Sequence, residues 1–197
     1  NLVWWVAIAA MTLDHLGAWV LEGQAAFILR CLGRMGLPVW GWAIARGYWS
    51  TKHLGAYMMR VLIVAMVATL PYYELTGRLW NPVFSLLLGL IIVDQIHMHE
   101  RWWVAAGIAL PVIAGGDWYM CAVPVAAAFG YPKHQHTNLV LLTVINAIGQ
   151  PWNALGLLGC LIIAKPVGVQ WRPHRWLKLG YYPAHLAVIA AWMQYVR

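Results

Sequence analysis

Asp14 and His15 stand side by side in an apolar stretch that runs from Leu2 to Leu21. In a membrane helix, an ionisable side chain near the centre costs about 2.5–3.5 kcal/mol to insert and usually faces a cavity or a partner. Adjacent positions on an α-helix differ by about 100°, so the two side chains lie on different faces, although both can line one interior groove. We interpret the pair as catalytic candidates. The alternative is an aspartate buried with an arginine for packing alone.

A second candidate, His185, lies in the C-terminal apolar stretch and follows two tyrosines. Tyr181 and Tyr182 precede it by four and three residues, so on a helix all three side chains can point into one pocket. An imidazole with a pKa near neutrality can move a proton. A lone buried histidine is more often structural, but the two tyrosines and the distant Asp14–His15 pair favour a catalytic interpretation.

Three arginines are the cations that could bind an anionic group. Arg30 and Arg34 are four residues apart, which places both guanidinium groups on one helix face. Such a pair suits a phosphate or a carboxylate; the alternative is snorkelling to the membrane interface. Arg60 lies inside an apolar stretch, and we expect it to be the counter-ion of Asp14. Asn81 precedes a proline, which is typical of a helix start, and it also offers an amide donor.

Two other classes of site are not predicted. Neither histidine-rich loop contains HExxH or a cysteine pair, so we expect no metal site; the residues concerned are Asp94, His97, His99, Glu100, His134 and His136. The three cysteines are far apart and form no CxxC pair. The net charge of +7 comes without a basic run or a known module, so we expect no nucleic-acid partner.

The composition identifies the class of protein. The chain is 62% hydrophobic and 10% charged, with a mean hydropathy of +0.65, whereas soluble domains carry about 25% charged residues. A chain with so little polar surface must face lipid. This excludes a secreted disulfide scaffold, a disordered region and an ordinary cytosolic enzyme, and it predicts an all-α polytopic integral membrane protein.

Apolar runs predict about nine transmembrane helices in a single domain covering residues 1–197. Some runs are shorter than the ~20 residues that a spanning helix needs, so either the pair around Gly115-Gly116 or the pair around Gln150-Pro151 can be re-entrant, which would leave seven. A further amphipathic helix is expected from Ala25 to Leu32, at the interface or folded into the site. The predicted spans are Leu2–Leu21, Met35–Trp49, Leu54–Tyr72, Pro82–Ile96, Trp102–Ala114, Trp118–Phe129, Thr137–Ile148, Trp152–Ala164 and Leu179–Val196.

The basic residues predict the orientation. Most of them fall in the loops that follow even-numbered spans, and the positive-inside rule makes those loops and the N-terminus cytoplasmic. The residues on this side are Arg46, Lys52, Arg101, Lys133, Lys165, Arg172, Arg175 and Lys178. This topology places His15 and His185 in opposite halves of their helices, so only a bent or water-filled interior would bring them together.

The motifs resemble those of the TraX family. Met11-Thr12-Leu13-Asp14-His15-Leu16-Gly17 is similar to its M-T-x-D-H-I-G signature. Further matches follow in the same order: Arg30-x-x-Gly33-Arg34-x-x-x-Pro38, Gly47-Tyr48-x-x-Thr51, Tyr57-x-x-Arg60, Pro71-Tyr72, Asn81 and Tyr182-Pro183-x-His185-Leu186. The resemblance covers nearly the whole chain, although residues 96–178 match only in hydropathy. Arg46 departs from the acidic residue that commonly precedes the Gly-Tyr pair.

The resemblance implies a function in conjugation. TraX proteins, with the similar TrbP proteins, are inner-membrane proteins implicated in acetylating the N-terminus of conjugative pilin, and they look distantly similar to transmembrane acyltransferases. We therefore expect acetyl-CoA as co-substrate, a pilin subunit as partner and the bacterial inner membrane as the location. The alternative is a non-enzymatic membrane chaperone or a small-solute transporter that uses the same buried charges.

The resemblance also implies roles for individual residues. His15 or His185 is the expected general base, with Asp14 orienting a histidine or paired with Arg60. The expected substrate- and cofactor-binding residues are Arg30, Arg34, Arg60, Thr51, Asn81 and Tyr182. Among these, Arg34 or Asn81 would donate to an oxyanion, and Arg30, with the basic loops, would bind the phosphates of CoA.

Overall fold

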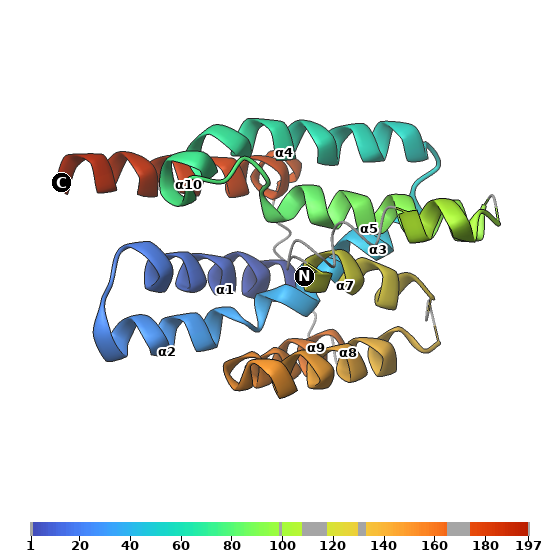
Figure 1. Cartoon of the computed structure of the whole chain (residues 1–197), viewed down its shortest axis with the longest axis horizontal. Helices are drawn as coiled ribbons and strands as arrows, with labels where there is room; N and C mark the ends of the chain where they lie inside the picture. The colour runs from blue at the N-terminus through green and yellow to red at the C-terminus, as the bar shows by residue number, and fades with distance from the viewer. Residues whose placement is uncertain (1, 99, 108–117, 130–132, 165–173, 197) are drawn as a thin grey trace.

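A computed structural model describes residues 2–98, 100–107, 118–129, 133–164 and 174–196, and these residues contain helices and no strand (Figure 1). The elements are α1 (Leu2–Trp19), α2 (Gly23–Gly33), α3 (Gly36–Ser50), α4 (Leu54–Thr76), α5 (Pro82–His97), α7 (Trp118–Phe129), α8 (Gln135–Gly149), the 3-10 helix η1 (Pro151–Leu155), α9 (Gly156–Ala164) and α10 (Arg175–Val196). Residues 102–107 are also helical. The prediction of an all-α fold is confirmed for the described residues.

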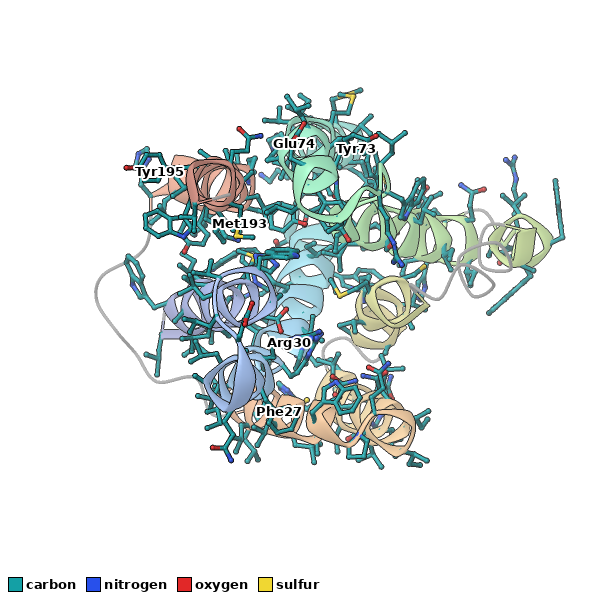
Figure 2. The ribbon with its side chains drawn as sticks, turned by 60° about the vertical axis from the view of Figure 1, so that its left-hand side comes forward. Phe27, Arg30, Tyr73, Glu74, Met193 and Tyr195 are labelled. Atoms are coloured by element: carbon teal, nitrogen blue, oxygen red, sulfur yellow. The ribbon has the colours of Figure 1, made fainter. Side chains whose placement is uncertain are left out.

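The surface of the helices is apolar where a soluble protein would be polar. The most apolar window of α4 has a mean hydropathy of 1.7, yet only 17% of it is buried. An apolar core helix of a soluble protein would be mostly covered, so the exposed apolar surface of α4 is compatible with a helix that faces lipid. Exposed apolar residues continue on α8 and α10, and Figure 2 shows Tyr73 of α4 and Tyr195 of α10 pointing outward. These are the features of a membrane protein.

The number of spans stays a prediction. Only α1 and α4 are long and apolar enough, within the described residues, to cross a membrane by length and composition. The expected helix at 152–164 is divided into η1 and the nine-residue α9, which fits the re-entrant interpretation of this pair. For the pair around Gly115-Gly116, residues 108–117 lie outside the described residues.

Helices α1, α4 and α10 run in the same direction, and α10 packs against both of the others (Figure 1). Helix α2 stands where the amphipathic helix was predicted and turns back along α1, and Gly33 is its one buried residue. The α1–α2 contact depends on small residues, because a Cβ at Gly17 would lie 2.6 Å from the Ala26 carbonyl oxygen.

Helices α2 and α3 form a broken pair that is interrupted at Arg34 and Met35, where the backbone forms turns. Both residues keep right-handed helical backbone angles, and i→i−3 hydrogen bonds replace part of the α-helical pattern there. Beyond this break, α3 is the central helix of the bundle, and its buried residues include Val39, Trp42 and Tyr48. The fold therefore places an irregular segment with an arginine in its interior.

Candidate active site

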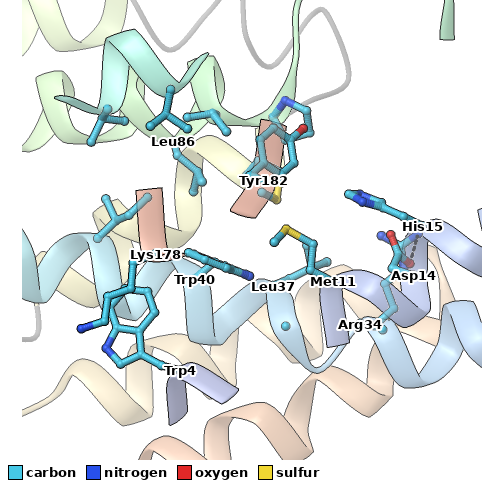
Figure 3. A pocket seen from close by; sticks show the side chains of 18 of the residues that line it. Trp4, Met11, Asp14, His15, Arg34, Leu37, Trp40, Leu86, Lys178 and Tyr182 are labelled. Carbon is cyan, nitrogen blue, oxygen red and sulfur yellow. Dashed lines mark ion pairs between the residues drawn. The ribbon is translucent and has the colours of Figure 1, made fainter. Parts of the chain in front are cut away.

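A cavity of about 600 Å³ lies between α1, α3, α4, α5 and α10, with single residues from α7, α8 and η1 closing it (Figure 3). Each helix contributes residues three, four or seven positions apart, which share one helix face. Figure 3 shows Asp14, His15 and Arg34 at one end and Trp4 and Lys178 at the other. The lining includes Trp4, Met11, Asp14 and His15 of α1; Leu37, Trp40 and Ile44 of α3; Tyr57, Arg60, Val61 and Val64 of α4; and Lys178, Leu179 and Tyr182 of α10.

The central contact of the site joins the imidazoles of His15 and His185. Nδ1 of His15 lies 2.5 Å from Nε2 of His185, and the ring planes differ by only 5°. The faces of stacked rings stay about 3.5 Å or more apart, so nitrogens this close meet edge to edge. The rings are joined by an in-plane N–H···N hydrogen bond.

The hydrogen bonds of His185 assign the tautomers. Its Nδ1 lies 2.8 Å from the carbonyl oxygen of Tyr181, and because a carbonyl only accepts, this nitrogen carries the proton. Nε2 of the neutral His185 is then an acceptor, and Nδ1 of His15 donates to it. The remaining nitrogen, Nε2 of His15, keeps its lone pair and has no hydrogen bond to a described residue. His15 is therefore the imidazole of the pair that is free to accept a proton.

Tyr181 holds the pair in place. Its ring lies against that of His185, with centroids 4.9 Å apart and planes 12° apart. Its hydroxyl is hydrogen-bonded to Oγ1 of Thr12. Because the Thr12 hydroxyl donates to the Ile8 carbonyl at 2.8 Å, Thr12 accepts from Tyr181. This bond fixes α10 against α1 one turn away from the histidines.

The meeting of the two histidines corrects the depths that we expected for them in their helices. We expected His15 and His185 in opposite halves of their helices, but α10 begins at Arg175 rather than Leu179. His15 follows the start of α1 by about 20 Å and His185 follows the start of α10 by about 15 Å, at 1.5 Å per residue. The two helices are therefore nearly in register at the histidines. No bend is needed to bring them together.

Asp14 pairs with Arg34. Nη2 of Arg34 lies 3.5 Å from Oδ1 of Asp14, and the side chains are only 18% and 21% exposed. Gly33 permits the approach, because a Cβ there would lie 2.6 Å from Cα of Asp14. The prediction that Arg60 is the counter-ion of Asp14 is therefore wrong. Arg60 lines the same cavity, and its guanidinium carbon is 5.9 Å from the ring centroid of Tyr57.

Four polar atoms of the cavity residues are buried without a hydrogen-bond partner among the described residues. They are Oδ1 of Asp14, Nε of Arg34, Oδ1 of Asn153 and the hydroxyl of Tyr182. The 3.5 Å contact of Asp14 is too long for a hydrogen bond. Unsatisfied buried groups are rare, and each costs about 1–3 kcal/mol unless a ligand or water satisfies it. The cavity therefore holds four polar atoms that a polar ligand or water would satisfy.

Three predicted binding residues lie outside the cavity. Asn81 is fully buried and caps α5: its Oδ1 accepts from the Val83 N–H at 3.0 Å, and its Nδ2 donates to the Ala65 carbonyl at 2.8 Å. These bonds use both ends of the amide, so Asn81 is not free to donate to a substrate. Thr51 lies in the α3–α4 turn, where Oγ1 accepts from the His53 N–H. Arg30 is exposed, and its stem lies against Gly17; Figure 2 shows it nearer the bundle interior than Phe27.

The histidine-rich loops form no metal centre within the described residues, where no three His, Cys, Asp or Glu side chains are placed to hold an ion. His97 packs edge-on against Trp49 with ring centroids 5.2 Å apart. His99 lies outside the described residues.

A comparison of the sequence with models of protein families shows which family the chain is related to. The model of the TraX protein family matches residues 1–192 of the 197. The chain belongs to the TraX family. This family is associated with the processing of conjugative pilin. Comparisons with curated proteins and with solved structures found no match.

The TraX motifs converge on the cavity. The first motif supplies Met11, Asp14 and His15, and later motifs supply Arg34, Tyr57, Arg60 and Tyr182. Residues separated by more than 160 positions therefore share one site in this TraX protein. His185 reaches the site through its bond to His15 and is absent from the lining.

Other residues of the site were not predicted. Lys178 was assigned to a loop because it lies among basic residues, but it is in the first turn of α10 and its Nζ lies 4.7 Å from the ring centroid of Trp4. Asn146, Gln150 and Asn153 also line the cavity. Their amides carry no charge and are common at turns, so the TraX sequence alone offered no signal for them.

Proposed function

We propose that the chain is a membrane-embedded acetyltransferase that moves an acetyl group from acetyl-CoA to the N-terminal amine of a conjugative pilin subunit. The observation that carries the proposal is the free Nε2 of His15, in a cavity that also holds the Asp14–Arg34 pair and unpartnered hydrogen-bond donors. A base, a carboxylate and donors in one enclosure are the parts that acyl transfer requires.

In the proposed reaction, Nε2 of His15 accepts a proton from the acceptor amine while the amine nitrogen attacks the thioester carbonyl. The C–N bond forms, the C–S bond breaks, and the thiolate leaves with the proton that His15 returns. An α-amine has a pKa near 7.7–8, so an imidazole is a base of sufficient strength. The N–H group at Nδ1 of His15 stays hydrogen-bonded to Nε2 of His185 throughout, so His185 acts as a positioning residue.

Two donors beside His15 suit the oxyanion that forms in this step. Nε of Arg34 and the hydroxyl of Tyr182 are buried and unpartnered among the described residues. The Tyr182 ring centroid lies 6.1 Å from that of His15. Preorganised donors of this kind contribute about 2.7–4 kcal/mol each in acyl transfer.

The cavity fits the arm and the phosphates of acetyl-CoA in its charge distribution. Lys178 and Arg60 are cations that line it near the starts of α10 and α4. The lining between them and His15 is apolar, with Met11, Leu37 and Leu86. Trp4 and Asp14 are ten residues apart on α1, so the cavity follows that helix for about 15 Å. Acetyl-CoA whose phosphates lie at Lys178 and Arg60 can therefore reach His15 with its extended pantetheine arm.

The length of the cavity also explains how acetyl-CoA and the pilin N-terminus could meet from opposite sides of the membrane. With the N-terminus cytoplasmic, the starts of α1, α4 and α10 face the compartment that supplies acetyl-CoA, and His15 lies toward the opposite face. Acetyl-CoA would enter at Lys178 and Arg60, and the pilin N-terminus would approach from the far side. The proposed orientation and the proposed chemistry are thus consistent.

Mass spectrometry of the cognate pilin tests the proposal in cells. Pilin made with the wild type should carry an N-terminal acetyl group, and pilin made with Asp14→Asn, His15→Ala or His185→Ala should be wholly or partly unacetylated. Full acetylation with all three variants would remove the assignment. A non-enzymatic chaperone would tolerate loss of His15 and His185 while still binding pilin.

A further inference from the structure

The wall of the cavity behind Arg34 carries two primary amides. Gln150 and Asn153 both line the cavity, at the junction of α8 and η1. A Cβ at Gly156 would lie 3.4 Å from the carbonyl oxygen of Arg34, so the end of η1 lies against the α2–α3 break. The two amides therefore stand beside the arginine that pairs with Asp14.

The amides orient each other. Nδ2 of Asn153 donates to Oε1 of Gln150 at 3.0 Å, which leaves the N–H groups of Gln150 directed away from this bond. Oδ1 of Asn153 is buried and has no partner among the described residues, and the residue is only 4% exposed. Together they present one acceptor and one donor. Reversing both amides would exchange these roles and still leave one of each.

A chain that contains secondary amides can match this pair, since it offers both N–H and carbonyl groups. The candidates are the acceptor polypeptide backbone and the amides of the pantetheine arm. Gln150 is exposed whereas Asn153 is buried, so the two amides extend from the protein surface toward Arg34. In Figure 1, the α8–α9 junction lies toward the same end of the bundle as the C-terminal end of α1, away from the starts of α1 and α10. Lys178 and Arg60 belong to the other end.

We infer that Gln150 and Asn153 form the subsite for the backbone of the second residue of an extended polypeptide N-terminus, an inference that rests on the proposed acetyl transfer. Oδ1 of Asn153 accepts the N–H of the acceptor's second residue, and Gln150 donates to the carbonyl of that same residue, because these two groups point to the same side of an extended chain. The α-amine then lies beside Asp14 and His15. The subsite recognises backbone, so it accepts different side chains at the second position.

The test compares a peptide with its ester analogue, in which an oxygen replaces the first peptide N–H. Binding and acetylation of both are measured with the full chain in lipid nanodiscs. The wild type should favour the peptide by about five- to tenfold, the usual effect of one hydrogen bond. Asn153→Ala and the more exposed Gln150→Ala should each reduce the preference to below about twofold, with the KM for acetyl-CoA unchanged.

Asn138→Ala is the matched control. Its amide also projects from α8, but Nδ2 donates to the Ala126 carbonyl at 3.1 Å and the residue does not line the cavity. This variant should keep the wild-type preference. A preference that persists in both subsite variants would overturn the inference, as would a raised KM for acetyl-CoA alone, which would identify pantetheine as the occupant. Discrimination in binding without any acetyl transfer would refute the proposed function and leave the peptide subsite standing.

Discussion

Substitutions at His185 separate the roles of the two imidazoles. His185→Ala removes the acceptor that lies 2.5 Å from Nδ1 of His15. Nδ1–H of His15 then loses its partner, the other tautomer becomes populated, and the ring is free to turn. His185→Gln supplies a side-chain oxygen that can accept the same N–H. His15→Ala and His15→Gln remove the base itself.

The expected losses follow from these roles. General-base catalysis contributes about 10²–10⁴-fold, so both His15 variants should lose that much in kcat. A hydrogen-bond partner that orients a histidine is worth about 10–100-fold, which is the loss expected for His185→Ala. His185→Gln should recover to within about fivefold of the wild type, because the hydrogen bond is retained in weaker form.

The assay is the initial rate of peptide acetylation by purified chain in nanodiscs, followed by mass spectrometry. His53→Ala is the control, because His53 is exposed and precedes α4 outside the cavity; its rate should equal that of the wild type. A His185→Gln enzyme as inactive as His15→Ala would refute the positioning role. A fully active His185→Ala would refute the hydrogen-bonded chain from Tyr181 to His15.

Three further predictions concern packing, lipid exposure and the co-substrate. Gly33→Ala should lower the free energy of unfolding by about 1–3 kcal/mol, because its Cβ would overlap Asp14 and force α1 and α2 apart; thermal unfolding in detergent measures it. Val67→Lys should reduce membrane integration, because Val67 is 58% exposed on an apolar helix and lysine costs about 2.5–3.5 kcal/mol there; membrane fractionation measures the inserted share. Arg60→Gln should raise the KM for acetyl-CoA about 10- to 150-fold, because charge-assisted hydrogen bonds to phosphate are worth about 1.5–3 kcal/mol; steady-state kinetics measures it.

Each of these predictions has a matched control. Gly55→Ala adds a methyl where nothing lies within 4 Å, so its melting temperature should not fall; equal melting of Gly33→Ala would contradict the close α1–α2 packing. Val67→Leu should insert like the wild type, and normal insertion of Val67→Lys would argue against lipid at this face. Arg78→Gln, in the exposed α4–α5 turn, should leave the KM unchanged, and an unchanged KM for Arg60→Gln would exclude Arg60 from phosphate binding.

The positions of three ionisable residues at the cavity could be anticipated, because such residues are expensive in an apolar helix. Asp14, His15 and His185 stood out against their neighbours, and all three belong to the site. The all-helical fold followed from composition and apolar runs for a similar reason. These signals are local, so one sequence is sufficient to detect them.

The partners could not be predicted, because they depend on how helices approach one another. We expected Arg60 as the counter-ion of Asp14, but Arg34 pairs with it, and this pairing depends on the close passage of α2 over α1 at Gly33. No periodicity encodes that approach. Asn81 is the opposite case: its capping signal was visible, and capping uses the amide that was expected to bind substrate.

Helix offsets along the membrane normal were equally hidden. Arg175 and Lys178 looked like loop residues because they are basic, although both belong to α10. Including them moves the start of α10 and brings His185 level with His15. The same shift carries Lys178 into the cavity.

The most direct test of the account is acetyl transfer by the purified chain. The protein in nanodiscs is mixed with acetyl-CoA and a synthetic peptide that has a free N-terminal amine, and the peptide mass is followed over time. The account predicts a time-dependent gain of one acetyl group at the N-terminus with the wild type and a loss of about 10²–10⁴-fold in rate with His15→Ala. Equal acetylation by the wild type and His15→Ala, or none by a wild type that binds acetyl-CoA and peptide, would contradict it.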